Sequence, residues 1–253
     1  LPILASNQER DALLAYHAHM ELGQRSAAFS ALSTYAATLS PGSGAAEAQR
    51  LLFELRRRRL PSGQVRLRGP AVEALYVGRF PFVLGRTAAR GAEKNGSESE
   101  PLWSLPDPGL SREHAQLESG DDAAAPFLLR DLSSKNGTTL AGLPVAAGQA
   151  LPLRQSGEIG LGPHVVLQFS VEKSRLELRI ERGLSRGTRI IASPQPLELP
   201  SGVRLDFAAD EGQPCLRFEG TTTLLLNGKR VFRTIELLRG DVIEIGDQRY
   251  EVA

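Results

Sequence analysis

Apolar and polar residues follow two different patterns along the chain, and the change falls near residue 62. Before it, apolar residues recur at the spacing of a helix that buries one face, as Leu13, Tyr16 and Met20 do. Gly23, a Ser-Pro-Gly turn at residues 40–44 and Pro61 interrupt this spacing. The pattern predicts three helices, at about residues 6–22, 27–39 and 45–59.

The order of small and large apolar residues in residues 28–55 resembles the end of a tetratricopeptide array, which implies a helical hairpin and part of another. Units of this kind need stacked neighbours for stability. We therefore expect more helices before Leu1. Because the chain starts with leucine and not methionine, we expect a fragment, and an upstream targeting or membrane segment stays open.

After residue 65, short apolar or β-branched runs alternate with clusters of Gly, Pro, Ser and Asp, as in FPFVLG, PFLLRDL and HVVLQFSV. This alternation is typical of an all-β sandwich or barrel. The long polar interruption at residues 88–109 is predicted to be a mobile loop. Its Leu102 and Trp103 either fold back on the sandwich or contact a partner.

A second β-rich block covers residues 173–253, and its end repeats the first block in degenerate form. The sequence LPLRQSGEIGLG followed by HVVLQF matches ELLRGDVIEIG followed by QRYEV. The chain is thus predicted to be mainly β, with two sandwiches preceded by an α-helical hairpin region. We expect three domains, at residues 1–61, 62–172 and 173–253.

Composition narrows the possible partners. The chain has 253 residues, 41% of them hydrophobic, and a net charge of +1, which gives no general reason to expect nucleic acid. Four consecutive arginines at positions 56–59 are either a solvated helix end or a basic patch for nucleic acid or membrane. The single cysteine, Cys215, fits a reducing compartment, and no apolar run reaches the length of a membrane helix. A cytoplasmic location is expected.

Four short signals in the first β block carry the chemistry of an anion site. In order, they are Gly85-Arg86 after an apolar strand, Ser-Arg-Glu-His at 111–114, Asp-Leu-Ser-Ser-Lys-Asn-Gly-Thr at 131–138, and a closing Leu…Gly…Ile-x-Leu-Gly pattern that ends at residue 162. A guanidinium holds two phosphate oxygens at once, a serine hydroxyl donates, and an asparagine amide pairs with a peptide backbone. Loops of a sandwich meet at one end and form such sites on a rigid scaffold.

Gly-Arg, then Ser-Arg-x-His, then Asp-x-x-Ser-x-Asn-Gly-Thr resembles the pattern of forkhead-associated (FHA) domains. The resemblance covers about residues 65–171. It implies an eleven-stranded β-sandwich that binds phosphothreonine peptides. The position after the second serine of the last motif, often threonine in the family, is Lys135 here.

The resemblance assigns roles residue by residue. Arg86 and Ser111 would contact the phosphate, Arg112 and Lys135 would line the phosphate and the neighbouring peptide, and Asn136 would hold the peptide backbone. The residues that shape the loops would be Gly85, His114, Gly137 and Thr138. Ser134, which would shape the same loop, is counted with the phosphopeptide-binding set. For each there is a plainer alternative: a surface charge, a strand-start hydroxyl, a turn residue or a packed histidine.

The second block lacks the Gly-Arg and Ser-x-x-His signals, so we expect it to have lost a phosphate site and to act as a packing partner or interaction surface. Threonines at 221–223 are a strand edge or a phosphorylation target for a sister molecule.

No catalytic set, metal pair or cofactor motif is found, since His17 and His19 face different ways on a helix and Cys215 has no histidine partner. The sequence therefore favours a non-enzymatic adaptor that acts downstream of a Ser/Thr kinase and binds a phosphothreonine-containing protein or peptide. This partner would be a Ser/Thr kinase or a substrate of one. The alternative is a phosphate-independent scaffold in a membrane-associated or secretion assembly.

Overall fold

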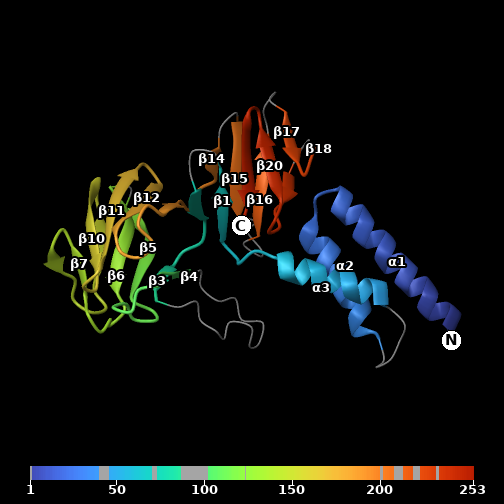
Figure 1. Cartoon of the computed structure of the whole chain (residues 1–253), viewed down its shortest axis with the longest axis horizontal. Helices are drawn as coiled ribbons and strands as arrows, with labels where there is room; N and C mark the ends of the chain where they lie inside the picture. The colour runs from blue at the N-terminus through green and yellow to red at the C-terminus, as the bar shows by residue number, and fades with distance from the viewer. Residues whose placement is uncertain are drawn as a thin grey trace.

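The computed structural model describes residues 2–39, 46–69, 73–86, 102–122, 124–199, 202–207, 213–218, 223–231 and 234–253. Three parts follow one another along the long axis of the molecule: a β-sandwich at one end, a second group of strands in the middle, and a bundle of helices at the other end (Figure 1). Within the described ranges, no helix combines the length and the apolar character needed to cross a membrane.

Three helices form the N-terminal part, as the apolar spacing predicts: α1 (Pro2–Glu21), α2 (Arg25–Ala37) and α3 (Ala46–Arg58). Their shared core contains Tyr16 from α1, Leu32 from α2, Leu52 from α3 and Leu238 from the C-terminal part of the chain. The predicted turn at residues 40–44 lies outside the described residues. Three helices alone only weakly suggest a tetratricopeptide array.

The FHA-like sandwich has a five-stranded sheet of order β4-β3-β5-β6-β9. The bounds of these strands are β3 (Phe82–Gly85), β4 (Leu102–Ser104), β5 (Ala115–Asp122), β6 (Ala125–Asp131) and β9 (Ala150–Leu153). Strand β4 pairs in parallel with β3, and Trp103 of β4 is 4% exposed in the sandwich core. Trp103 therefore folds back on the sandwich, while residues 88–101 of the predicted loop lie outside the described residues.

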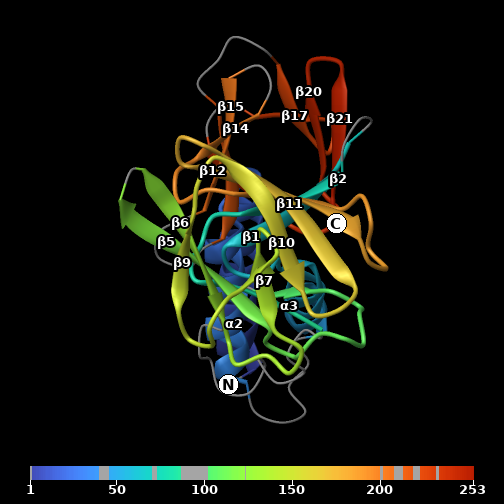
Figure 2. The same cartoon turned by 90° about the vertical axis from the view of Figure 1, so that its left-hand side faces the viewer.

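A twelve-stranded sheet runs through both sandwiches, with the order β18-β17-β20-β21-β1-β2-β13-β12-β11-β10-β7-β8. One half packs over the five-stranded sheet (Figure 2). The strands of that half are β7 (Thr138–Leu140), β8 (Leu143–Pro144), β10 (Ser156–Leu161), β11 (Val165–Glu172), β12 (Arg175–Arg182) and β13 (Arg189–Ala192). The other half contains β1 (Gln64–Arg68), β2 (Glu73–Val77), β17 (Leu224–Leu226), β18 (Lys229–Arg230), β20 (Val242–Ile245) and β21 (Gln248–Val252).

The predicted internal repeat is present in the strand connectivity. A four-stranded sheet, β14-β15-β16-β19, corresponds to β3-β5-β6-β9, and the pairings of β17, β18, β20 and β21 correspond to those of β7, β8, β10 and β11. Its strands are β14 (Leu197–Leu199), β15 (Val203–Phe207), β16 (Pro214–Phe218) and β19 (Thr234–Glu236). The C-terminal sandwich is completed by β1, which pairs with β21, and by β2. The FHA-like sandwich is thus inserted between two parts of the second one.

Strands β2 and β13 lie at the join and belong to both cores. They pair in parallel, and successive side chains of a strand point to opposite faces. Leu75 of β2 and Ile190 of β13 lie in the core of the FHA-like sandwich, whereas Ala74 and Ile191, their neighbours in sequence, lie in the core of the other. A division into three domains remains a proposal. With the expected boundary at residue 172, β12 and β13 would belong to the third domain by sequence, although their buried side chains lie in the core of the FHA-like sandwich.

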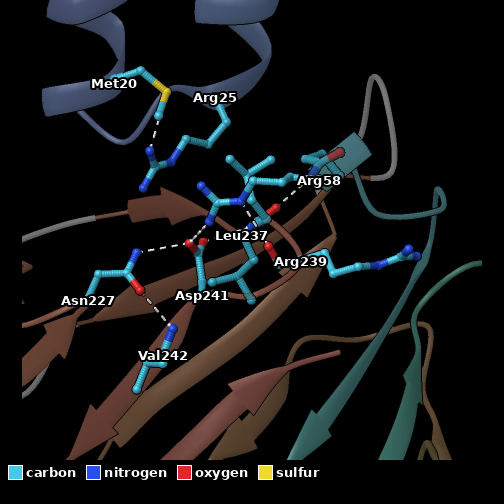
Figure 3. A network of polar contacts seen from close by, with 10 residues as sticks. Met20, Arg25, Arg58, Asn227, Leu237, Arg239, Asp241 and Val242 are labelled. Carbon is cyan, nitrogen blue, oxygen red and sulfur yellow. Dashed lines mark hydrogen bonds and ion pairs between the residues drawn. The ribbon is translucent and has the colours of Figure 1, made fainter. Parts of the chain in front are cut away.

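The helices are attached to the C-terminal sandwich through a buried carboxylate, Asp241, which is 0% exposed (Figure 3). It accepts hydrogen bonds from the Arg58 guanidinium at 2.7 Å, from the Asn227 amide at 2.9 Å and from the backbone N–H of Leu238 at 2.8 Å. A charge without solvent contact needs this number of donors to be tolerated. The end of α3 is thereby held on the loop between β19 and β20.

A second contact lies at the start of α2. The side chain of Glu236 on β19 accepts a hydrogen bond from the backbone N–H of Ser26 at 2.5 Å, and its own N–H donates to the carbonyl of Gly23. The residue before the helix, Gln24, makes no side-chain cap. Glu236 therefore satisfies a free N–H group of the helix and places a negative charge at its positive end.

The four arginines at 56–59 make different contacts. Arg58 is bonded to Asp241, Arg56 and Arg59 lie over the ring of Phe29, and Arg57 lies over the ring of Phe53. These contacts agree with the helix-end interpretation of the arginine run.

Candidate functional site

The predicted binding loops meet at the end of the FHA-like sandwich where β3 ends. A Cβ atom on Gly85 would lie 1.7 Å from the carbonyl oxygen of Arg112, so only glycine permits this close approach of the two loops. The N–H of Arg86 donates to the carbonyl of Ser111 at 2.8 Å, and the N–H of His114 donates to the carbonyl of Leu84 at 2.9 Å. Arg86 and Ser111 are therefore held side by side by main-chain bonds.

His114 is buried and links two loops. Its Nδ1 accepts a hydrogen bond from the N–H of Ser111 at 3.1 Å, and its Nε2 donates to the carbonyl of Gly137 at 3.0 Å. This arrangement uses the neutral ring with its proton on Nε2. Burial lowers the pKa of His114 from its ordinary value of 6.5, which favours the same neutral form.

Asp131, at the end of β6, organises the loop that follows. Its carboxylate accepts hydrogen bonds from the N–H of Ser134 at 3.0 Å, from the Ser134 hydroxyl at 2.6 Å and from the Thr138 hydroxyl at 2.6 Å. Burial raises the pKa of Asp131, but these hydrogen bonds outweigh it, and the pKa lies below its ordinary value of 3.8. The side chain of Ser134 is thus turned towards Asp131.

Two further bonds fix the residues at the tip. The backbone N–H of Lys135 donates to the Ser111 hydroxyl oxygen at 2.9 Å, and the Asn136 amide donates to the carbonyl of Gly109 at 2.8 Å. The Ser111 hydroxyl keeps its own proton for another acceptor, and the Asn136 side-chain oxygen remains available as an acceptor. Gly137, at φ 75°, takes the left-handed conformation that closes this turn.

These loops surround an open pocket of about 650 Å³. It is lined by Arg86, Pro108, Gly109, Leu110, Ser111, Arg112, Glu113, Lys135 and Asn136. The structure thus brings together five of the six residues expected to bind phosphopeptide, and Ser134 does not line the pocket. Across the described ranges, no ion pair joins Arg86, Arg112 or Lys135 to a carboxylate. The pocket therefore presents three cationic side chains to solvent.

Sequence reasoning placed Asp131 in the motif at 131–138 but gave it no role, and it did not single out the Pro108–Gly109 segment. The signal for Asp131 was present, because an aspartate followed by a serine three positions later forms a local side-chain turn. Residues 108 and 109 contribute mainly backbone and carry no such signal. In the described residues no group of three or more His, Cys, Asp or Glu side chains could hold a metal ion.

Residues 84–162 match the family model of the FHA domain, and this segment contains Arg86, Ser111, His114 and Asn136. This segment of the chain is therefore an FHA domain. FHA domains are protein-interaction modules that bind phosphopeptides.

Among solved structures, the chain is similar to the solution structure of the FHA domain of a hypothetical protein from Arabidopsis thaliana. The identity is 24%, with 42% of this chain and 82% of that chain covered and a TM-score of 0.27. No curated protein matches the chain significantly.

Proposed function

We propose that the pocket at the tip of the FHA domain binds phosphothreonine-containing peptides, and that the protein is a non-enzymatic adaptor in Ser/Thr kinase signalling. The observation that carries the proposal is the pocket itself: three cationic side chains and one serine hydroxyl surround it, and no carboxylate pairs with the cations among the described residues. A phosphate brings about −1.5 to −2 charges and three strong acceptor oxygens. The partner would be a phosphorylated protein, such as a Ser/Thr kinase or its substrate.

Each lining residue has a chemical role in this proposal. Arg86 holds two phosphate oxygens with its planar guanidinium, and Ser111 donates its remaining proton to a third. Arg112 and Lys135 add positive charge, and the Asn136 side-chain oxygen accepts from a peptide N–H. Each charge-assisted hydrogen bond contributes about 1.5–3 kcal/mol, so two or three separate a phosphorylated peptide from a plain one by orders of magnitude.

The test compares Arg86→Ala with Arg154→Ala. Both arginines are exposed, but Arg154 lies just before β10, at the end of this strand that is away from the site. The other end of β10 leads to Gly162, whose N–H donates to the carbonyl of Gly137 in the site. A phosphothreonine peptide library should yield a binder of about micromolar strength, measured by fluorescence anisotropy. We expect Arg86→Ala to abolish binding while circular dichroism stays unchanged, and Arg154→Ala to bind as wild type does. Equal binding by both variants would show the site assignment to be wrong.

A phosphate-independent scaffold gives a different result in a second measurement. If a captured partner is treated with phosphatase, the proposed adaptor should release it, whereas scaffold contacts would survive. A cytoplasmic location belongs to the same proposal and is supported by the single, unpaired cysteine, Cys215.

A further inference from the structure

The wall of the pocket contains a β-bulge next to Arg86. Between Leu84 and Arg86, strand β3 has one residue, Gly85, whereas the facing segment has two, Arg112 and Glu113, between its own bonded residues. The carbonyl of Arg112 and the N–H of Glu113 press on Gly85, where a Cβ atom would lie 1.7 and 3.2 Å from them. Bulges of this kind redirect side chains and are frequent next to binding sites. The main chain at Glu113 is thereby fixed beside the proposed phosphate site.

Glu113 is the one carboxylate among the nine residues that line the pocket. It is exposed, and in the described part of the chain it makes no ion pair with Arg86, Arg112 or Lys135. Two other carboxylates of this domain are paired, since Glu118 binds Arg130 and Glu177 binds Arg189. The negative charge of Glu113 is therefore not neutralised within the site and acts on whatever enters it.

Taken alone, the negative charge of Glu113 disfavours the binding of an anion. With three cations and one carboxylate the lining carries a net charge of +2, which a phosphate dianion balances. If the peptide carried an acidic residue beside the phosphorylated one, that residue would be repelled by Glu113, and the three cations of the pocket would already be balanced by Glu113 and the phosphate. A lysine or arginine at that place would pair with it across the rim.

Resting on the proposed function, we infer that Glu113 is a specificity-determining residue, which selects phosphothreonine peptides carrying a basic residue beside the phosphorylated one and disfavours acidic neighbours. Exposed ion pairs are modest in strength, so we expect about a two- to fivefold difference in affinity between peptides with lysine and with alanine at that position. The difference should shrink as ionic strength rises.

The experiment is a charge exchange between protein and peptide. A set of phosphothreonine peptides carries lysine, alanine or glutamate at each of the neighbouring positions in turn, and affinities are measured by anisotropy for wild type, Glu113→Gln and Glu113→Lys. At one or more positions wild type should prefer lysine, then alanine, then glutamate. Glu113→Gln should flatten this order, and Glu113→Lys should reverse it.

Glu172→Gln is the matched control, since Glu172 is exposed on the same domain but lies at the far end of β11 from the site. It should keep the wild-type order. Binding of all peptides with no charge preference, or an order unchanged in Glu113→Lys, would overturn the role of Glu113 alone. If wild type bound none of the phosphopeptides more tightly than its unphosphorylated form, the proposed function would instead be overturned.

Discussion

His114 shows how one buried side chain makes the stability of the protein depend on pH. Because burial lowers the pKa of His114 below 6.5 in the folded protein, the unfolded chain binds more protons between that lowered pKa and 6.5. The free energy of unfolding should therefore fall as the pH drops below about 6.5, by at most about 1.4 kcal/mol per pH unit for this group. The pKa of Asp131 lies below 3.8, so its protonation lowers the free energy of unfolding further only at pH values below about 3.8.

The measurement is urea unfolding between pH 8 and pH 5, followed by the fluorescence of Trp103, the single tryptophan, which is buried in the same core. His114→Gln should start less stable, because the N–H of Ser111 and the carbonyl of Gly137 lose their partner, but its pH slope over this range should be smaller. An identical slope in both proteins would contradict the assignment.

At this scale the motif residues were predictable and their bonding partners were not. Arg86, Ser111 and Asn136 could be named because the order of their motifs on strand ends resembles the FHA pattern. That the Ser134 hydroxyl turns to Asp131, and that the Asn136 amide bonds the carbonyl of Gly109, depends on the backbone path of two loops that are distant in sequence. Periodicity carries no information on such a path.

Among elements, the end of α3 offers a matched pair of neighbouring arginines. Arg58 binds Asp241, which is fully buried, whereas Arg57 lies over the exposed ring of Phe53. Removing Arg58 takes a charged donor from a buried carboxylate, so Arg58→Ala should lower the free energy of unfolding by about 1–3 kcal/mol. Arg57→Ala should cost about 0.5–1 kcal/mol or less.

Urea unfolding followed by far-UV circular dichroism compares the two variants. Equal losses would mean that Arg58 does not anchor the helix to the sandwich. The sequence predicted these helices and most strands because one buried face imposes a simple period. It placed the arginine run at a helix end, but four identical residues in a row give no sign of which one meets a carboxylate far away in the sequence.

On the scale of the whole molecule, the continuous sheet was beyond prediction from sequence. Strand β1 pairs with β21, and β2 pairs with β13, so the C-terminal sandwich is completed by strands that precede the FHA domain. An alternating apolar pattern shows that a strand has a buried face, but it does not show which strand lies beside it. The predicted domain boundary at residue 172 was placed where the family resemblance ends. The residues that make up each core are determined instead by pairings between strands that are distant in sequence.

The shared strands make the two sandwiches mechanically dependent, and this can be tested with a substitution in one core and a probe in the other. Leu205 of β15 is 0% exposed in the core of the C-terminal sandwich. Leu205→Ala should cost about 2–5 kcal/mol. Because β2 and β13 lie in both cores, loss of the C-terminal sandwich exposes one face of each strand and should destabilise the FHA domain as well. The fluorescence of Trp103, in the FHA core, should therefore report a lower unfolding midpoint.

Leu184→Ala, at a side chain that is 74% exposed, is the control and should leave that midpoint unchanged. If the midpoint reported by Trp103 stayed at the wild-type value in Leu205→Ala while circular dichroism showed an earlier separate transition, the two sandwiches would be independent. A single, shifted transition seen by both probes would instead mean that the twelve-stranded sheet unfolds as one unit. The helices bound to Asp241 would then be connected to the proposed phosphopeptide pocket through one cooperative body.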